Sequence, residues 1–139
     1  MALQVITLGY CQLAGAFSLH TYANNITLSF EAEDLNVTVF GDSWGDHMAG
    51  LKNGTLNVGG FNDFADNLVD ETLYGYFDTG TNIAAAVRPS SAAISTANPE
   101  FQFNVTPLTW SPIAADVGQV SAFTISWPTS GAVVRDVTP

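Results

Sequence analysis

The stretch Leu35–Phe61 constrains the fold most, because two alternating strand patterns in it are joined by an unusually long connection. Leu35, Val37 and Val39 share one face before the connection, and Leu56 and Val58 share one face after it. Antiparallel strands in small domains are usually joined by about two to five residues. A longer connection is commonly either functional or disordered.

The predicted inter-strand loop, at about residues 41–53, contains large apolar side chains among glycines and acids. Trp44, Met48 and Leu51 are the main examples. A disordered segment would be poor in such anchors and rich in charge. We therefore expect this loop to become ordered by packing on another surface, with the rest of the chain as its platform.

The composition predicts that much of the surface meets other protein. The chain has 139 residues, which predicts one domain over residues 1–139. Hydrophobic residues make up 47% and charged residues only 12%, against roughly 25% charged in an average soluble domain. The single cysteine, Cys11, is predicted to be a small buried apolar residue.

The charge of the chain is one-sided, with thirteen Asp and Glu against three Lys and Arg, for a net charge of −10. Gripping a phosphate backbone requires clustered Lys and Arg, so binding to nucleic acid is not expected. No apolar run has the length of a membrane span, and the region 1–15 lacks the basic start of a signal peptide. We expect assembly in a cytoplasm and no membrane partner.

Alternating residues predict a mainly β fold with one helix. The expected helix covers about residues 63–77, with Asn62 or Asp63 as its cap and Gly80 as its stop. An acidic bend is expected at Glu31–Asp34, and Gly59 with Gly60 predicts a bulge or a close backbone approach. Arms are predicted at residues 1–16 and 130–139. Strands are predicted at Gln4–Leu8, Phe17–Tyr22, Ile26–Phe30, Leu35–Val39, Gly54–Phe61, Ile83–Val87, Phe101–Val105, around Trp110 and after Gly118, with Phe123, Ile125 and Trp127 inward.

The polar faces of these strands carry hydroxyls and amides and almost no formal charge. An ordinary solvated sheet face would show Lys and Glu, so this pattern fits a face that is wet but does not adhere. The members of this set are Thr27, Ser29, Asn36, Thr38, Thr55, Asn57, Gln102, Asn104, Thr124 and Ser126.

No motif for catalysis or metal binding is recognisable, so we expect no enzymatic activity, no metal and no cofactor. His20 and His47 are far apart and have no Cys pair or HExxH spacing. The acidic clusters lack the spacing of a calcium loop, and no GxSxG motif or phosphate-binding glycine loop is present.

Three segments resemble, in order, the major tail (tail tube) proteins of long-tailed bacteriophages. They are DLNVTVFGDSWGDHMAGLKNGTLNVGGFNDF, ETLYGYFDTGTN and GQVSAFTISWPTSGAVVRD. The family commonly shows a "TTFGD"-like turn, an "AGLKDGSLSLSGFFD"-like return strand, a helix closing on "LLGSGT" and a final strand running into "SGALTR". The matching residues here are Thr38–Asp42, Ala49–Asp63, Leu73–Thr81 and Ser130–Arg135.

This resemblance implies a β-sandwich or partly closed barrel with one flanking helix. It also implies hexameric rings that stack into the tail tube of a virion, through which genomic DNA passes without specific binding. Tape-measure, tail-tip and tail-terminator proteins are the implied partners. The loop would contact a neighbouring subunit through Gly41, Asp42, Trp44, His47, Met48 and Leu51, and the lumen would be lined by Thr27, Ser29, Glu31, Asp34, Asn36, Thr38, Thr124 and Ser126.

Two other classes remain open. A head decoration protein would also be β-rich, but it would form a discrete particle rather than a tube. A carbohydrate-binding sandwich would use Trp44, Trp110 and Trp127 as stacking platforms. The second class is disfavoured because Trp127 alternates with Phe123 and Ile125 and therefore belongs to the core.

Overall fold

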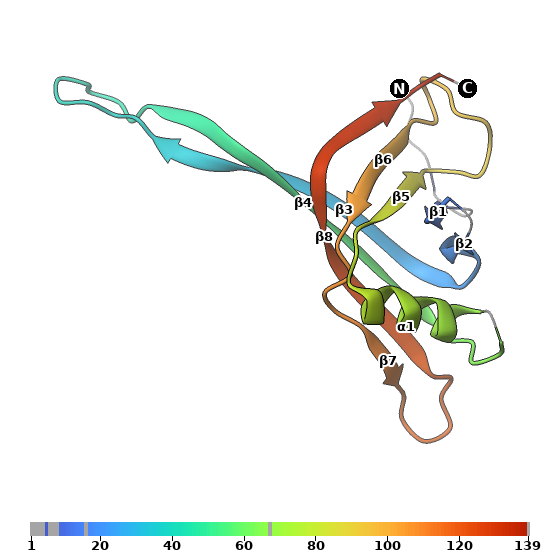
Figure 1. Ribbon diagram of the computed structural model, residues 1–139. Coiled ribbons are helices and arrows are strands. Elements are labelled where there is room, and N and C mark those ends of the chain that lie inside the picture. Colours follow the sequence, from blue (N-terminus) through green and yellow to red (C-terminus); the bar gives the residue numbers. More distant parts are fainter. Residues whose placement is uncertain (1–4, 6–8, 16, 67, 139) are drawn as a thin grey trace.

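The computed structural model describes residue 5 and residues 9–15, 17–66 and 68–138. It contains eight strands, one α-helix and a short 3-10 helix at Leu19–Thr21 (Figure 1). The elements are β1 (Tyr10–Leu13), β2 (Phe17–Ser18), β3 (Ala23–Asn36), β4 (His47–Phe61), α1 (Val69–Thr79), β5 (Ile83–Arg88), β6 (Glu100–Val105), β7 (Ser111–Ala114) and β8 (Ala122–Asp136).

The strands form one antiparallel sheet in the order β2-β1-β5-β6-β8-β4-β3, with β7 paired beside β8. The long strand β8 bends and serves two halves of this sheet: residues 122–128 pair with β4, and residues 129–136 pair with β6 (Figure 1). We call β7, the first half of β8, β4 and β3 the arm sheet, and the remaining strands the first sheet. The described strands do not close into a barrel, and the predicted mainly β fold with one flanking helix is confirmed.

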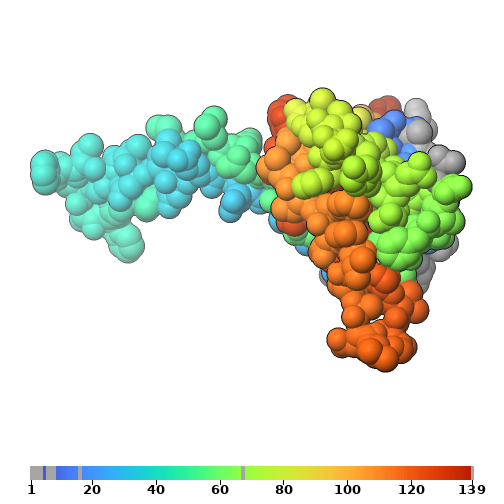
Figure 2. All heavy atoms as spheres, turned by 60° about the horizontal axis from the view of Figure 1, so that its bottom comes forward, coloured from blue at the N-terminus to red at the C-terminus, as the bar shows by residue number. Residues whose placement is uncertain are grey.

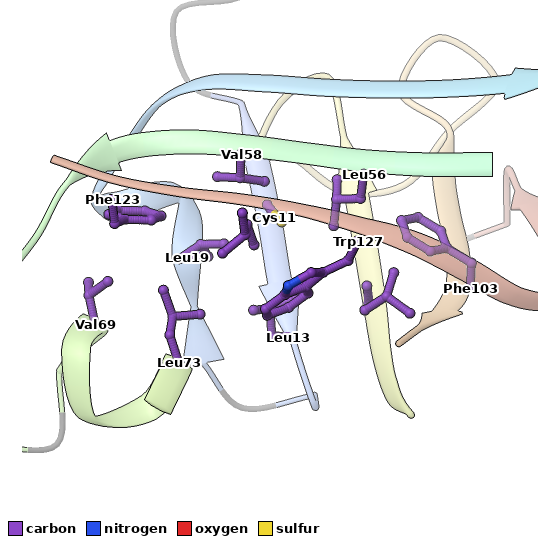
Figure 3. Close-up of a cluster of buried hydrophobic side chains, with 13 residues drawn as sticks. Cys11, Leu13, Leu19, Leu56, Val58, Val69, Leu73, Phe103, Phe123 and Trp127 are labelled. Carbon is purple, nitrogen blue, oxygen red and sulfur yellow. The ribbon is translucent and has the colours of Figure 1, made fainter. Parts of the chain in front are cut away.

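The core lies where the two halves of the sheet face each other (Figure 3). Phe123, Ile125 and Trp127 alternate along β8 and are fully buried, as their spacing predicts. Trp127 lies beside Leu56 and Ile125 beside Val58 on the same face of the sheet, and burying each such side chain stabilises the fold by about 1.5–3 kcal/mol. The remaining buried hydrophobic residues are Cys11, Leu13, Leu19, Val69, Leu73, Ala85, Phe103 and Val105.

Two predictions about single core residues are confirmed. Cys11 is buried, and desolvation raises the pKa of its thiol to about 12. At Gly60 the backbone approaches closely, because a Cβ there would lie 2.2 Å from the carbonyl oxygen of Tyr22. No side chain fits this position without moving the β3 entry.

The helix starts later than predicted. Asp63 does not cap it, because its Oδ1 accepts the Ala65 N–H and its carbonyl oxygen accepts the Asp70 N–H across a non-helical segment. Helix α1 therefore begins at Val69 rather than near Asp63. Its stop is as predicted: Gly80 adopts a left-handed φ of 69° and donates its N–H to the Tyr76 carbonyl.

The prediction of an inter-strand loop at about 41–53 has the wrong bounds. The loop covers residues 37–46, and β4 already pairs with β3 at His47 opposite Asn36. The predicted bend at Glu31–Asp34 lies inside β3, where the register shifts between Ala32 and Asp34. Apolar and polar residues do not alternate here because both faces of this end of the hairpin are exposed, so no buried face imposes a period of two on the sequence.

Other boundaries also differ. The predicted strand Phe17–Tyr22 is two residues of β2 followed by the 3-10 helix. The strand expected around Trp110 is β7, which begins at Ser111. The segment Ser130–Asp136, predicted as a polar tail, pairs with β6 as the end of β8. The strand predicted at Gln4–Leu8 lies outside the described residues except for Val5, which is in no strand.

Candidate assembly surfaces

The β3–β4 hairpin extends far beyond the body of the protein as an arm, defined here as residues 31–53 (Figures 1 and 2). Six residues of β3, Glu31–Asn36, span about 20 Å at the usual strand rise, and the loop 37–46 adds to this. Side chains fasten the loop: the Thr38 Oγ1 accepts the Asp46 N–H at 2.7 Å, and the Asp42 Oδ2 accepts the Val39 N–H at 3.0 Å. The arm is therefore an ordered projection.

Large apolar side chains of the arm are exposed. Trp44 is 86% exposed, Leu51 76% and Met48 57%, and the other exposed members are Leu35, Val37, Val39 and Phe40. Single exposed hydrophobic residues are ordinary, but a group of this size concentrated on one projection is typical of an interaction site. The structure thus brings the sequence-predicted loop residues to the outermost part of the molecule.

The two faces of the paired part of the arm carry different residues, although Glu33 lies beside Leu35 on one of them. Leu35 and Met48 are cross-strand partners and therefore share a face. The other face carries Asp34 and His47, whose Oδ1 and Nδ1 atoms lie 2.8 Å apart. Both side chains are largely exposed, so this pair contributes little to stability. The predicted interface residues His47 and Met48 thus point in opposite directions.

The predicted lumen residues fall into two groups. Thr27, Ser29, Thr124 and Ser126 lie on the outer face of the arm sheet, where Thr27 pairs with Asn57 and Asn57 with Ser126. Asp34, Asn36 and Thr38 instead belong to the arm, where the Asn36 Oδ1 accepts the Thr38 N–H at 3.0 Å. Glu31 lies at the junction, opposite Asn53.

The arm sheet is free at both edges in the part of the chain that the structure describes. Its strands alternate in direction in the order β7-β8-β4-β3, with β3 paired only with β4 and β7 only with β8. Pro112 lies in β7 and lacks an N–H, which fits an edge position. Free edges invite pairing with another chain.

Sequence reasoning missed a second projection, the connection from β7 to β8 (Figure 2). Val117 and Val120 on this connection, and Ile113 in β7 next to it, are all largely exposed. The signal was available as three β-branched apolar residues around a turn.

Sequence reasoning also missed a groove of about 1080 Å³ between β3 and the first sheet, where β5 ends and β6 begins. Ile26, Leu28 and Phe30 line it from β3, and Val87 and Phe101 line it from β5 and β6. We call it the inter-sheet groove. The centroids of the Phe30 and Phe101 rings lie 6.2 Å apart at one end of the groove. Its walls come from segments far apart in the sequence, so no local pattern could reveal it.

The three tryptophans do not form one platform. Trp127 is fully buried and donates its Nε1–H to the Thr109 carbonyl at 2.7 Å. Trp110 contacts the rings of Tyr74 and Phe77, and Trp44 is on the arm. This arrangement argues against the carbohydrate-binding class.

The described residues contain no group of three or more His, Cys, Asp or Glu placed to hold a metal ion. In the same part of the chain, no helix is long and apolar enough to cross a membrane.

Solved structures with the same fold come from tail and baseplate particles. A protein in the virion of a native gene transfer agent particle matches with a TM-score of 0.68 and 17% identity, covering 83% of this chain and 85% of that one. A protein of the SPP1 tail tube matches with a TM-score of 0.71 and 8% identity over 93% of this chain and 77% of that one. A protein of the anti-feeding prophage baseplate matches with a TM-score of 0.60 and 12% identity, covering 96% of this chain and 97% of that one. The fold implied by the sequence resemblance is thereby confirmed.

No protein-family profile matches the chain, and no curated protein matches it.

Proposed function

We propose that this chain is a structural tail-tube subunit whose copies join into hexameric rings that stack into a tube for DNA. The observation that carries the proposal is the arm sheet, which has two free edges and an uncharged polar outer face. The fold that the chain shares with tail-tube structures supports it.

The directions of the strands allow the arm sheet to continue from copy to copy. Because β7, β8, β4 and β3 alternate in direction, β3 of one copy can meet β7 of the next as an antiparallel pair. Such a contact is head-to-tail, and it forms a ring when the rotation closes. Closure also removes the exposed edges that would otherwise aggregate.

The outer face of the arm sheet is suited to line the channel of such a ring. Thr27, Ser29, Thr124 and Ser126 present hydroxyl groups and no cation that could pair with phosphate. The net charge of −10 adds a general repulsion of DNA. DNA would therefore pass through without being held. Glu31 would lie near the end of this lining, whereas Asp34, Asn36 and Thr38 would lie on the arm.

The arm provides the contact between subunits along the tube. Its exposed apolar residues, with Trp44 and Met48 among them, are the candidate interface, and its length allows it to reach a copy outside its own ring position. Such a subunit acts through assembly rather than catalysis, within the virion tail and after assembly in the host cytoplasm. Tape-measure, tail-tip and tail-terminator proteins are its proposed partners.

Negative-stain electron microscopy of the purified protein tests the proposal. Rings or tubes with a central hole are expected. The alternative, a head decoration protein, would give discrete small particles without a channel, and that result would overturn the tail-tube function.

A further inference from the structure

We propose that the inter-sheet groove is the docking site for the arm of a second copy of this chain. This inference rests on the proposed tube function and names the surface that its arm contact would use. The argument depends on the lining of the groove, the charge of the arm and the direction in which the arm projects.

The groove is apolar at its base and polar at its rim. Ile26, Leu28, Phe30, Val87 and Phe101 supply the apolar lining, and its volume of about 1080 Å³ exceeds that of a few side chains. Phe30 is itself 46% exposed. The rim includes His20, Thr21, Asn24, Asn25 and Ser91.

The charge of the arm does not oppose its docking in the groove. Among the residues that the structure describes, no Asp or Glu lines the groove, although the chain has thirteen of them, and the two ionisable lining residues are His20 and Arg88. Arg88 forms an ion pair with Glu100, so the groove is close to neutral rather than strongly basic. The arm carries one Lys against five acids, which are Glu31, Glu33, Asp34, Asp42 and Asp46. An acidic arm with exposed apolar side chains fits a groove that offers apolar contact without repulsion.

A second, partly exposed aromatic surface is less suited to this arm. Tyr74, Phe77 and Trp110 form it on helix α1 and the segment before β7. The same helix carries Asp70, Glu71 and Asp78, so an acidic arm would meet like charges there. The inter-sheet groove and this aromatic surface therefore differ in charge, and cross-linking can show which of them the arm contacts.

The occupant must be another copy, because the arm projects away from the body (Figures 1 and 2). Its strands stay paired from Phe30 opposite Gly54 to Asn36 opposite His47, so the arm cannot turn back into its own groove. A β7 strand added at the β3 edge would lie in the plane of the arm sheet. This β7 strand would therefore extend the wall of the groove and would not occupy its interior. The interior would stay open for the arm of a third copy.

Cross-linking between two singly substituted proteins tests the docking site. A Ser43→Cys protein, with the new thiol beside Trp44 in the arm loop, is mixed with a tagged Ser91→Cys protein and treated with a short bifunctional thiol reagent. Both positions are exposed, and the buried Cys11 stays silent. Cross-linked heterodimers are expected from assembled protein. A Ser43→Cys mixture with Tyr74→Cys is the control for the helix surface.

Cross-linking to Tyr74→Cys in place of Ser91→Cys, or to neither in well-formed tubes, would overturn the groove as the docking site while leaving the tube function intact. Failure of the wild-type protein to form rings or tubes would instead overturn the tube function. The two failures are thus distinguishable.

A charge variant supplies a second test. Asn24→Glu with Ser91→Glu places carboxylates on both rims, and we expect at least a tenfold higher protein concentration to be needed for tubes, with partial recovery in high salt. Adding Asp46→Lys on the arm should restore assembly at low salt. Asn24→Gln with Ser91→Thr is the uncharged control. Normal assembly of the double Glu protein would contradict the docking site.

Discussion

Trp44 offers the sharpest prediction about assembly, because it is large, sits on the arm and is 86% exposed. Burying a Trp removes about 150–250 Å² from water, which at about 25 cal/mol per Å² corresponds to a gross gain of about 4–6 kcal/mol. Ordering costs reduce this, and truncating such an interface anchor typically costs about 2 kcal/mol or more. A loss of about 2 kcal/mol weakens each contact about 30-fold.

The Trp44→Ala protein should therefore stay folded but fail to form tubes at concentrations where wild type assembles. Trp44 makes no contact with the core, so its replacement should change the free energy of unfolding by less than about 0.5 kcal/mol. Analytical ultracentrifugation measures assembly, and circular dichroism during urea unfolding measures stability.

Tyr74→Ala is the matched control, since Tyr74 is also an exposed aromatic residue but lies on α1. It should assemble as wild type does. A folded Trp44→Ala protein that polymerises like wild type would refute the role of the arm, whatever the state of the control.

Three further predictions concern the channel, the core and the backbone. Thr124→Lys with Ser126→Lys should leave tubes intact but make them bind DNA in filter-binding assays at low salt and release it at high salt. Intact tubes that bind no DNA would place these residues outside the channel. Trp127→Ala should lower the free energy of unfolding by about 3–5 kcal/mol in urea titrations, because the side chain is fully buried; a loss below about 1 kcal/mol would contradict this. Gly60→Ala should lower the free energy of unfolding by at least about 1–3 kcal/mol, since a Cβ there would lie 2.2 Å from a backbone oxygen. Gly75→Ala in α1, with open space around it, should leave the free energy of unfolding unchanged or raise it by up to about 1 kcal/mol. Equal effects of the two changes would be inconsistent with the close approach at Gly60.

The body of the fold could be predicted from the sequence because burial imposes a period. In β8, Phe123, Ile125 and Trp127 alternate with exposed residues, and in β4 Leu56 and Val58 alternate with half-buried ones. One face of each strand is packed and the other is wet, so the pattern of residues records the geometry.

The arm could not be predicted as a strand pair for the same reason. Between Glu31 and Asn36, and again between His47 and Asn53, every side chain is exposed or nearly so. Backbone hydrogen bonds hold the hairpin there, and such bonds leave no trace in side-chain polarity. The apolar residues of the loop are exposed on the projection, as an interface would require, but that they form one stays a prediction, and the sequence did not reveal the two faces of the arm.

The groove and the helix start depended on contacts between distant residues. Ile26 and Phe101 lie on different halves of the sheet and meet only after β8 bends. Likewise, Asp63 favoured a helix cap by residue type, but its hydrogen bonds to Ala65 and Asp70 hold a non-helical segment instead. Tertiary contacts decided both features.

A cryo-electron microscopy reconstruction of the purified assembly tests the central claim most directly. The account predicts a tube in which β3 of one copy pairs with β7 of the next, and in which Thr27 and Ser126 face the channel. A tube whose channel is lined by other strands, or a protein that forms only discrete particles without a channel, would contradict it.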